Sequence, residues 1–254
     1  MFTARSFMLA GLNTIQKHNS MRAKLYLIPG TMCNARLWSE LSTYLHHYEL
    51  VHMAIPSGCG AEQLVEQLAS ALPDQKVALL GFSAGAYLAS LLTLRYPEKV
   101  EKLMLVSNSP CPLSANELAL RKHNLQLINR YGYKGISLKK AEAMIDSSLH
   151  SHAVAHHQVS IIRQMDTELG EEVLKAQLLG TSERRDLKNE LLKIEQRLCF
   201  VYSEQDPLIN IRWMQDFSRH TQAVMHRVVG SGHMLPLEQP QLLSDYIRQW
   251  LNAP

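Results

Sequence analysis

The chain has 254 residues, of which 46% are hydrophobic and 19% are charged, an ordinary composition for a globular protein. This length accommodates one domain with an insertion, or two small domains. The formal net charge of +3 is too small to indicate a nucleic-acid partner, and no basic stripe with stacking aromatic residues supports one. No apolar run approaches the length of a membrane-spanning helix, so no membrane partner is expected.

Short apolar runs and amphipathic segments alternate along most of the chain. Strands are predicted at 24–28, 49–54, 76–81, 102–107, 197–202 and 224–229. Helices with one apolar face are predicted at 34–46 and 62–72, and a last helix at about 241–251. Strands that alternate with helices indicate a mostly parallel, twisted sheet with helices on both faces, which is the α/β class.

The interval from 111 to 195 breaks this alternation. It contains no convincing strand, and helical stretches are predicted at 114–130, 138–149, 152–166, 168–179 and 184–193. A second independent domain would explain the interval, but the chain afterwards returns to strands of the same sheet. We therefore expect a core made of residues 1–110 and 196–254, with 111–195 as a helical insertion.

The N-terminal segment and the cysteines give little information about function. The apolar stretch at 7–12 is too short for a secretory signal core, and residues 1–20 are interpreted either as an outer β-ribbon or as an extension. The four cysteines, at positions 33, 59, 111 and 199, form no C-x-x-C pair, so neither a zinc site nor a disulfide framework is expected. Reduced thiols in a cytoplasmic enzyme are the simplest interpretation.

Residues 81–85 read Gly-Phe-Ser-Ala-Gly, a G-x-S-x-G motif between a predicted strand and a helical stretch that stops at Pro97. Strand, sharp turn and helix is the context in which this motif presents a nucleophilic serine. The glycines matter because the turn packs its backbone too closely for a β-carbon. We expect Ser83 to be held in a strained conformation with its hydroxyl pointing out of the sheet. The alternative is a glycine-rich turn with a spectator serine.

A nucleophilic serine needs a base, and the base needs an orienting carboxylate. Asp206 follows the predicted strand at 197–202, and His233 lies on a loop that follows the predicted strand at 224–229. Open α/β sheets place catalytic groups beyond the carboxyl ends of their strands. The order serine, aspartate, histidine along the chain is the hydrolase order.

In order and spacing, these three loops resemble those of the capped α/β-hydrolases, and the resemblance covers nearly the whole chain from about residue 24. It implies that Ser83 is the nucleophile, His233 the general base and acid, and Asp206 the orienting acid. Glu204 and Glu238 are rival carboxylates. Asp206 is preferred because Glu204 is too close to the strand end and Glu238 follows the histidine.

The oxyanion hole of such an enzyme needs two main-chain N–H groups aimed at the developing charge. The resemblance assigns one to Ala84, the residue after the nucleophile. The other comes from the loop after strand 24–28, where many family members have His-Gly and this chain has Pro29-Gly30. Thr31 N–H is the expected second donor, and Met32 N–H is the less favoured choice. The departure removes the family's histidine from the loop but not the main-chain donor.

The resemblance also implies that the helical insertion is a cap over Ser83, which would exclude water and shape the substrate pocket. Residues 114–163 contain seven basic and three acidic residues. Such a face would steer an acidic carrier or an anionic substrate, although a solvated helix surface is the simpler interpretation. His152 and His156 are one helical turn apart, a spacing that suits a metal ion, but no H-E-x-x-H motif is present and no metal site is predicted.

The expected reaction is hydrolysis of a carboxylic ester through an acyl-enzyme, without a metal or an organic cofactor. The pattern Pro-Gly-x-x-Cys-x-x-Arg-Leu-Trp at 29–38 is similar to that of small bacterial esterases such as the pimeloyl-acyl-carrier-protein methyl ester esterases of biotin synthesis. This resemblance implies a small-molecule or carrier-linked ester substrate. Thioester, lactone and C–C bond hydrolysis stay open, as does a ligand-binding protein with little catalysis. The sequence does not give the oligomeric state.

Overall fold

The computed structural model describes residues 22–58 and 60–253, so the prediction for residues 1–20 lies outside the described residues. A six-stranded sheet forms the centre of the molecule, with the strand order β2-β1-β3-β4-β5-β6 and every neighbouring pair parallel. The strands are β1 (Lys24–Ile28), β2 (Glu49–His52), β3 (Val77–Phe82), β4 (Val100–Val106), β5 (Arg197–Ser203) and β6 (Val224–Val228). The predicted parallel α/β sheet is therefore confirmed, with strand ends displaced by at most two residues.

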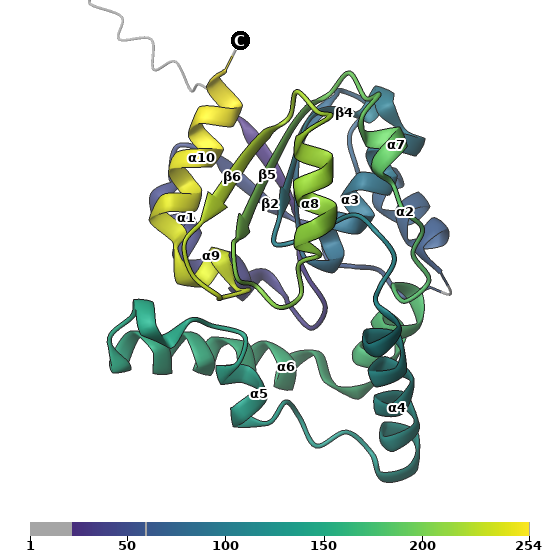
Figure 1. The fold of residues 1–254 in the computed structure, drawn as a ribbon, viewed down its shortest axis with the longest axis vertical. Helices are drawn as coiled ribbons and strands as arrows, with labels where there is room; N and C mark the ends of the chain where they lie inside the picture. The colour runs from purple at the N-terminus through teal and green to yellow at the C-terminus, as the bar shows by residue number, and fades with distance from the viewer. Residues whose placement is uncertain (1–21, 59, 254) are drawn as a thin grey trace, which may run out of the picture.

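Helices cover both faces of the sheet (Figure 1). One face carries α1 (Ser39–Tyr44) and α10 (Pro240–Asn252), and the other carries α2 (Ala61–Ser70), α3 (Ala84–Arg95) and α8 (Ile211–Ser218). Short elements complete these layers: η1 (Ala35–Trp38), η2 (Pro97–Lys99) and α9 (Leu235–Glu238). The helix predicted at 34–46 is thus split, because η1 turns as a 3-10 helix before α1 begins.

The core explains why these segments form these elements. Successive residues of a strand point to opposite faces, so Leu79 packs in the cluster under α2 and α3, whereas Leu80 packs in the cluster under α1 and α10. Helix α3 is buried nearly throughout, and its internal hydroxyls are satisfied: Ser90 Oγ donates to Ala86 O (2.8 Å) and Thr93 Oγ1 to Ala89 O (2.9 Å). The most central helix therefore follows directly on the serine of the G-x-S-x-G motif.

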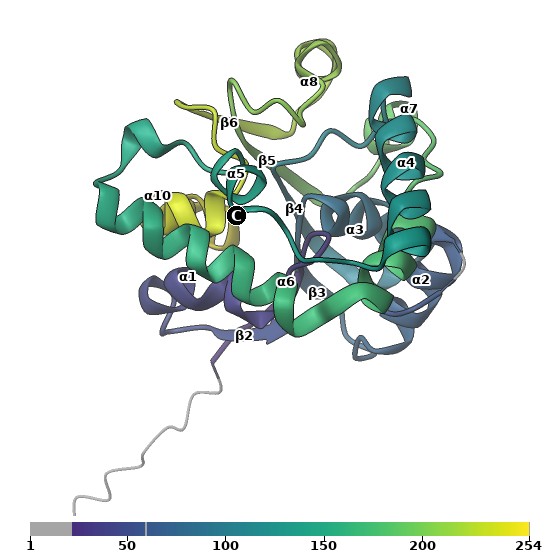
Figure 2. The same cartoon turned by 90° about the horizontal axis from the view of Figure 1, so that it is seen from below.

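The interval 111–195 contains helices and no strand. Its elements are α4 (Ala115–Tyr131), α5 (Leu138–Glu142), η3 (Ser147–Leu149), α6 (His152–Gly180) and α7 (Lys188–Leu191). Helices α4, α5 and α6 lie beyond the carboxyl ends of the strands, and Figure 2, viewed from that side, shows α6 crossing the edge of the sheet. Helix α7 instead packs in the core through Leu187 and Leu191. The division into a core and a cap stays a prediction.

Helix α6 is bent three residues after the break that the sequence predicts between helices 152–166 and 168–179. At Gly170 the backbone has φ 73° and ψ −171°, which interrupts the helical conformation between an arm of residues 152–169 and an arm of residues 171–180. Glycine adopts such a conformation without a Cβ penalty. The bend lets one helix follow two directions over the carboxyl edge of the sheet, where the loops after β1, β3, β5 and β6 all emerge.

Candidate active site

Ser83 stands at the turn between β3 and α3, with φ 50° and ψ −120°. A β-carbon at Gly81 would lie 2.5 Å from Ala86 Cα, and one at Gly85 would lie 2.2 Å from Pro29 O, so both positions require glycine. Ser83 N–H donates to Val106 O (2.9 Å), which continues the ladder between β3 and β4. The backbone around Ser83 is therefore fixed on both sides in a conformation that L-residues rarely adopt.

His233 and Asp206 converge on this serine from two other strand ends. His233 Nε2 lies 3.0 Å from Ser83 Oγ, and His233 Nδ1 lies 2.6 Å from Asp206 Oδ2. The histidine and the aspartate are each 4% exposed. Because the carboxylate accepts from Nδ1–H, the lone pair of the neutral imidazole is directed from Nε2 toward the serine hydroxyl. The arrangement suits transfer of the serine proton to His233.

The rival carboxylates occupy other positions. Glu204 is exposed, and its Oε1 lies 3.7 Å from Arg227 Nε. Glu238 is 5% exposed, and its Oε1 accepts from Asp146 N–H (2.6 Å) rather than from an imidazole nitrogen. Burial raises the pKa of Glu238 to about 7. Of the three candidates, Asp206 is the one hydrogen-bonded to His233.

Residues of the helical interval hold the loop of His233 (residues 229–234, the histidine loop) by hydrogen bonds that the sequence does not predict. Met144 O accepts from His233 N–H (2.9 Å) and, more weakly, from Met234 N–H (3.3 Å). Asp146 Oδ2 accepts from the N–H (2.8 Å) and the hydroxyl (3.1 Å) of Ser231. The hydrogen bond from the Ser148 hydroxyl, followed by those from Ser231, holds the pKa of Asp146 low, at about 2. No sequence pattern identifies such contacts, because main-chain carbonyls carry no residue-specific signal.

The two expected oxyanion donors lie at adjoining turns. Ala84 is the first residue of α3, so its N–H has no acceptor within the helix and lies at the positive end of the helix dipole. The loop after β1 closes a turn in which Cys33 N–H donates to Gly30 O (3.2 Å). In this turn Met32 N–H donates to Gln177 Oε1 (2.8 Å). Among the described residues, no acceptor is found for the N–H of Thr31 or Ala84.

The histidine cluster of the helical interval lies mainly on the surface of α6. His152 and His156 are exposed on α6, and His157 Nε2 lies 3.5 Å from Glu40 Oε1. In the part of the chain that the structure describes, no group of three histidine, cysteine, aspartate or glutamate side chains is arranged to hold a metal ion. No helix of that part is long and apolar enough to cross a membrane.

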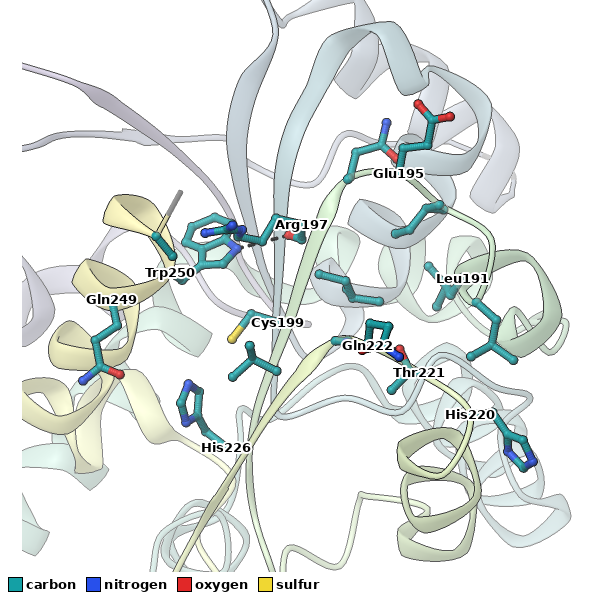
Figure 3. A pocket seen from close by; sticks show the side chains of 17 residues that line it. Leu191, Glu195, Arg197, Cys199, His220, Thr221, Gln222, His226, Gln249 and Trp250 are labelled. Carbon is teal, nitrogen blue, oxygen red and sulfur yellow. Dashed lines mark hydrogen bonds between the residues drawn. The ribbon is translucent and has the colours of Figure 1, made fainter.

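A separate cavity of about 670 Å³ lies at the amino ends of β5 and β6, and Figure 3 shows it between Trp250, Cys199 and Gln222. Trp250 Nε1–H donates to Arg197 O (3.2 Å) at its border. Ser83, Asp206 and His233 follow the carboxyl ends of the strands. The cavity is therefore at the opposite edge of the sheet and is not part of this site.

Comparison with protein-family models gives a match to the Ndr family over residues 54–251, about three quarters of the chain. The chain belongs to the Ndr family. The matched range contains Ser83, Asp206 and His233 but begins after the turn that holds Thr31.

Solved structures share the fold of this Ndr family member. An esterase from Thermogutta terrifontis has a TM-score of 0.75 with 21% identity and covers 90% of this chain and 89% of its own. An alpha/beta hydrolase enzyme from a deep-sea metagenome library has a TM-score of 0.73 with 14% identity and covers 92% of this chain and 90% of its own. Likeness at these identities shows the fold, so the expected α/β-hydrolase fold is confirmed.

A curated relative matches in part. The pimeloyl-[acyl-carrier protein] methyl ester esterase of Salmonella heidelberg is 36% identical over 111 residues, which are 40% of this chain and 43% of the relative. The match therefore spans less than half the length of that relative.

Proposed function

We propose that this protein is a serine hydrolase that cleaves carboxylic esters through an acyl-enzyme. The observation that carries the proposal is the continuous hydrogen-bonded series from Ser83 Oγ to His233 Nε2 (3.0 Å) and from His233 Nδ1 to Asp206 Oδ2 (2.6 Å). The elbow geometry of Ser83 and the low exposure of the other two side chains support it.

The proposed reaction has two halves. Ser83 Oγ attacks the ester carbonyl carbon while His233 Nε2 takes the hydroxyl proton, and the carbonyl electron pair moves to the oxygen. That oxyanion accepts hydrogen bonds from the N–H groups of Thr31 and Ala84. In comparable enzymes, removal of one such donor raises the activation free energy by about 3–4 kcal/mol. The alcohol leaves with the proton from His233. Water then attacks the acyl-enzyme by the same steps and releases the carboxylic acid.

Asp206 orients His233 and stabilises the imidazolium that forms during proton transfer. None of these steps needs a metal or an organic cofactor. In this proposal, helices α4, α5 and α6 form the cap that borders the acyl or alcohol pocket. The thiols of Cys33, Cys111 and Cys199 are free, which supports action in the cytoplasm.

A carrier-linked methyl ester is the substrate that we propose within this class. The partial relative carries the name of a pimeloyl-[acyl-carrier protein] methyl ester esterase. Six of the seven basic residues at 114–163 are exposed and available to an acidic carrier: Lys122, Arg130, Lys134, Lys139, Lys140 and Arg163. The seventh, Arg121, pairs with Glu117 (2.8 Å) instead and is largely withdrawn from solvent.

The test is a hydrolysis panel of p-nitrophenyl esters, acyl thioesters, lactones and synthetic pimeloyl-carrier methyl ester. We expect ester cleavage that falls at least about 10³-fold in Ser83→Ala and about 10²- to 10⁴-fold in Asp206→Asn. Ser107→Ala is a matched control: Ser107 follows the neighbouring strand with the same φ of 50°, but no partner for its buried hydroxyl is found among the described residues.

The outcomes separate the two levels of the proposal. Ester cleavage that is equal in wild type and Ser83→Ala would refute the serine mechanism. Cleavage of p-nitrophenyl esters without methanol release from the carrier-linked ester would refute that substrate alone. Faster cleavage of thioesters or lactones than of any ester would show that the same residues catalyse a different hydrolysis.

A further inference from the structure

Gln177, on the second arm of α6, touches the loop that supplies the second oxyanion donor. Its Oε1 accepts from Met32 N–H at 2.8 Å, across 145 residues of sequence, and the side chain is 4% exposed. Only the oxygen of a glutamine amide accepts a hydrogen bond, so this contact fixes the orientation of the amide. A buried side chain from the helical interval thus holds one peptide group of the oxyanion loop.

The peptide group that Gln177 holds is a strained one. Met32 has φ 55° in the turn closed by Cys33 N–H and Gly30 O, and positive φ is uncommon for a residue with a side chain. Rotation of the peptide between Thr31 and Met32 would relieve this strain and convert the turn to another type. The hydrogen bond to Gln177 opposes the rotation, because a rotated Met32 N–H would lose its buried acceptor.

The same contact distinguishes between the two candidate donors of the loop. Met32 N–H is engaged by Gln177, whereas no acceptor for Thr31 N–H is found among the described residues. Thr31 N–H is therefore the group left to meet an oxyanion, provided that the turn keeps its shape. Many capped α/β-hydrolases have a histidine at the position of Pro29. The proline side chain has no hydrogen-bonding group that could support the turn.

Hydrogen bonds around the end of α6 hold Gln177 in place. The hydroxyl of Thr181 donates to the main-chain oxygen of Gln177 (2.7 Å), and the main-chain oxygen of Thr181 accepts from Arg184 Nε (2.8 Å). Arg121 Nη1 donates to the hydroxyl of Thr181 (3.2 Å), which ties this turn to α4. The bend at Gly170 separates this arm from the rest of α6. Gln177 therefore belongs to a fixed support.

We propose that Gln177 is a positioning residue. By holding the Thr31–Met32 peptide it fixes the shape of the turn at 30–33, and thereby keeps Thr31 N–H, which belongs to the preceding peptide of the same turn, directed at the developing oxyanion. This proposal rests on the ester hydrolysis proposed above. In this proposal, a side chain of the helical interval supports the turn, in place of a side chain within the loop itself. The side chain acts through the loop and needs no contact with the substrate.

Gln177→Met is the decisive variant, because it keeps the length of the side chain and removes the acceptor. With a p-nitrophenyl ester we expect kcat to fall about ten- to a hundredfold and KM to change less than about threefold, because the lost interaction serves the transition state. Gln158→Met is the matched control: Gln158 is also on α6 and 3% exposed, but its Nε2 donates to Leu237 O (3.1 Å). We expect its kcat to stay within about threefold of wild type.

Amide hydrogen exchange of Met32, followed by NMR, is a second readout that does not depend on turnover. We expect exchange at least about tenfold faster in Gln177→Met than in wild type, and near-wild-type protection in Gln177→Glu, which retains an acceptor oxygen at the same reach. Unchanged Met32 exchange in Gln177→Met would overturn the proposal, as would a kcat equal to that of Gln158→Met. A wild-type protein with no Ser83-dependent hydrolysis would instead refute the proposed function.

Discussion

The turn that holds Ser83 and the turn at 30–33, which we call the oxyanion turn after the proposed role of Thr31, are neighbours, yet different parts of the chain hold them. Residues 81–86 fix Ser83 through their own close backbone contacts and through the adjoining strands. The turn at 30–33 depends on Gln177, and the residues after it, Asn34 and Arg36, bind Glu168 of the same helix. A short motif thus specifies one half of the site, whereas tertiary contacts over more than 130 residues support the other half.

The largest effect is expected where the local turn is broken. In Gly85→Ala the new Cβ would lie 2.2 Å from Pro29 O, and neither backbone can move without disturbing both turns. We expect a loss of more than about 3 kcal/mol in the free energy of unfolding, measured by urea denaturation. Gly60→Ala is the control, since a Cβ there meets no atom within 4 Å. Equal stability of the two variants would contradict this account of the elbow.

An intermediate effect on stability is expected from Glu238, which is buried against the histidine loop. Burial raises the pKa of Glu238 to about 7. Below the usual glutamate pKa both folded and unfolded chains are protonated. As the pH rises from about 4.5 to 7, the unfolded chain releases the proton first, so the free energy of unfolding falls by up to about 3 kcal/mol. Glu238→Gln should remove this decline and be the more stable protein at pH 8.

Urea denaturation at pH 5 and pH 8 measures the effect, with Glu204→Gln as a control for an exposed carboxylate near the same loop. We expect the Glu204 variant to keep the wild-type decline. A Glu238→Gln protein with the same decline as wild type would show that the carboxyl of Glu238 is ionised throughout the range.

The smallest effect is expected at the exposed contacts of the oxyanion loop. Arg36 and Glu168 form a close ion pair (2.8 Å), but their side chains are 46% and 37% exposed, so water and salt weaken it. Glu168→Gln should lower the melting temperature slightly at low salt and not at all at high salt. A large, salt-independent loss would mean that this pair, rather than Gln177, holds the loop.

The sequence predicted the sheet well because buried parallel strands are short apolar runs that periodicity identifies. The elbow at Ser83 was also predictable, since its motif is contiguous and its glycines have a steric cause. The loops of Asp206 and His233 were found by their place after strands and by the family resemblance, and the structure brings both side chains to Ser83.

Other residues of the site left no signal in the sequence. Gln177 and Met144 contact the site through hydrogen bonds that depend on how the helical interval folds back over the sheet. Neither belongs to a motif, and a glutamine on a helix is usually exposed. The local sequence of Glu238 likewise gives no sign that this side chain is buried against the histidine loop.

Cys33 gives the oxyanion turn a reporter of its own. Its N–H closes the turn, its thiol is 6% exposed, and burial raises the pKa of that thiol to about 12. Alkylating reagents attack the thiolate, so modification of Cys33 at neutral pH requires the turn to open. Cys199, fully buried in β5, becomes reactive only when the sheet itself unfolds. The ratio of the two alkylation rates therefore measures how often the turn opens while the rest of the molecule stays intact.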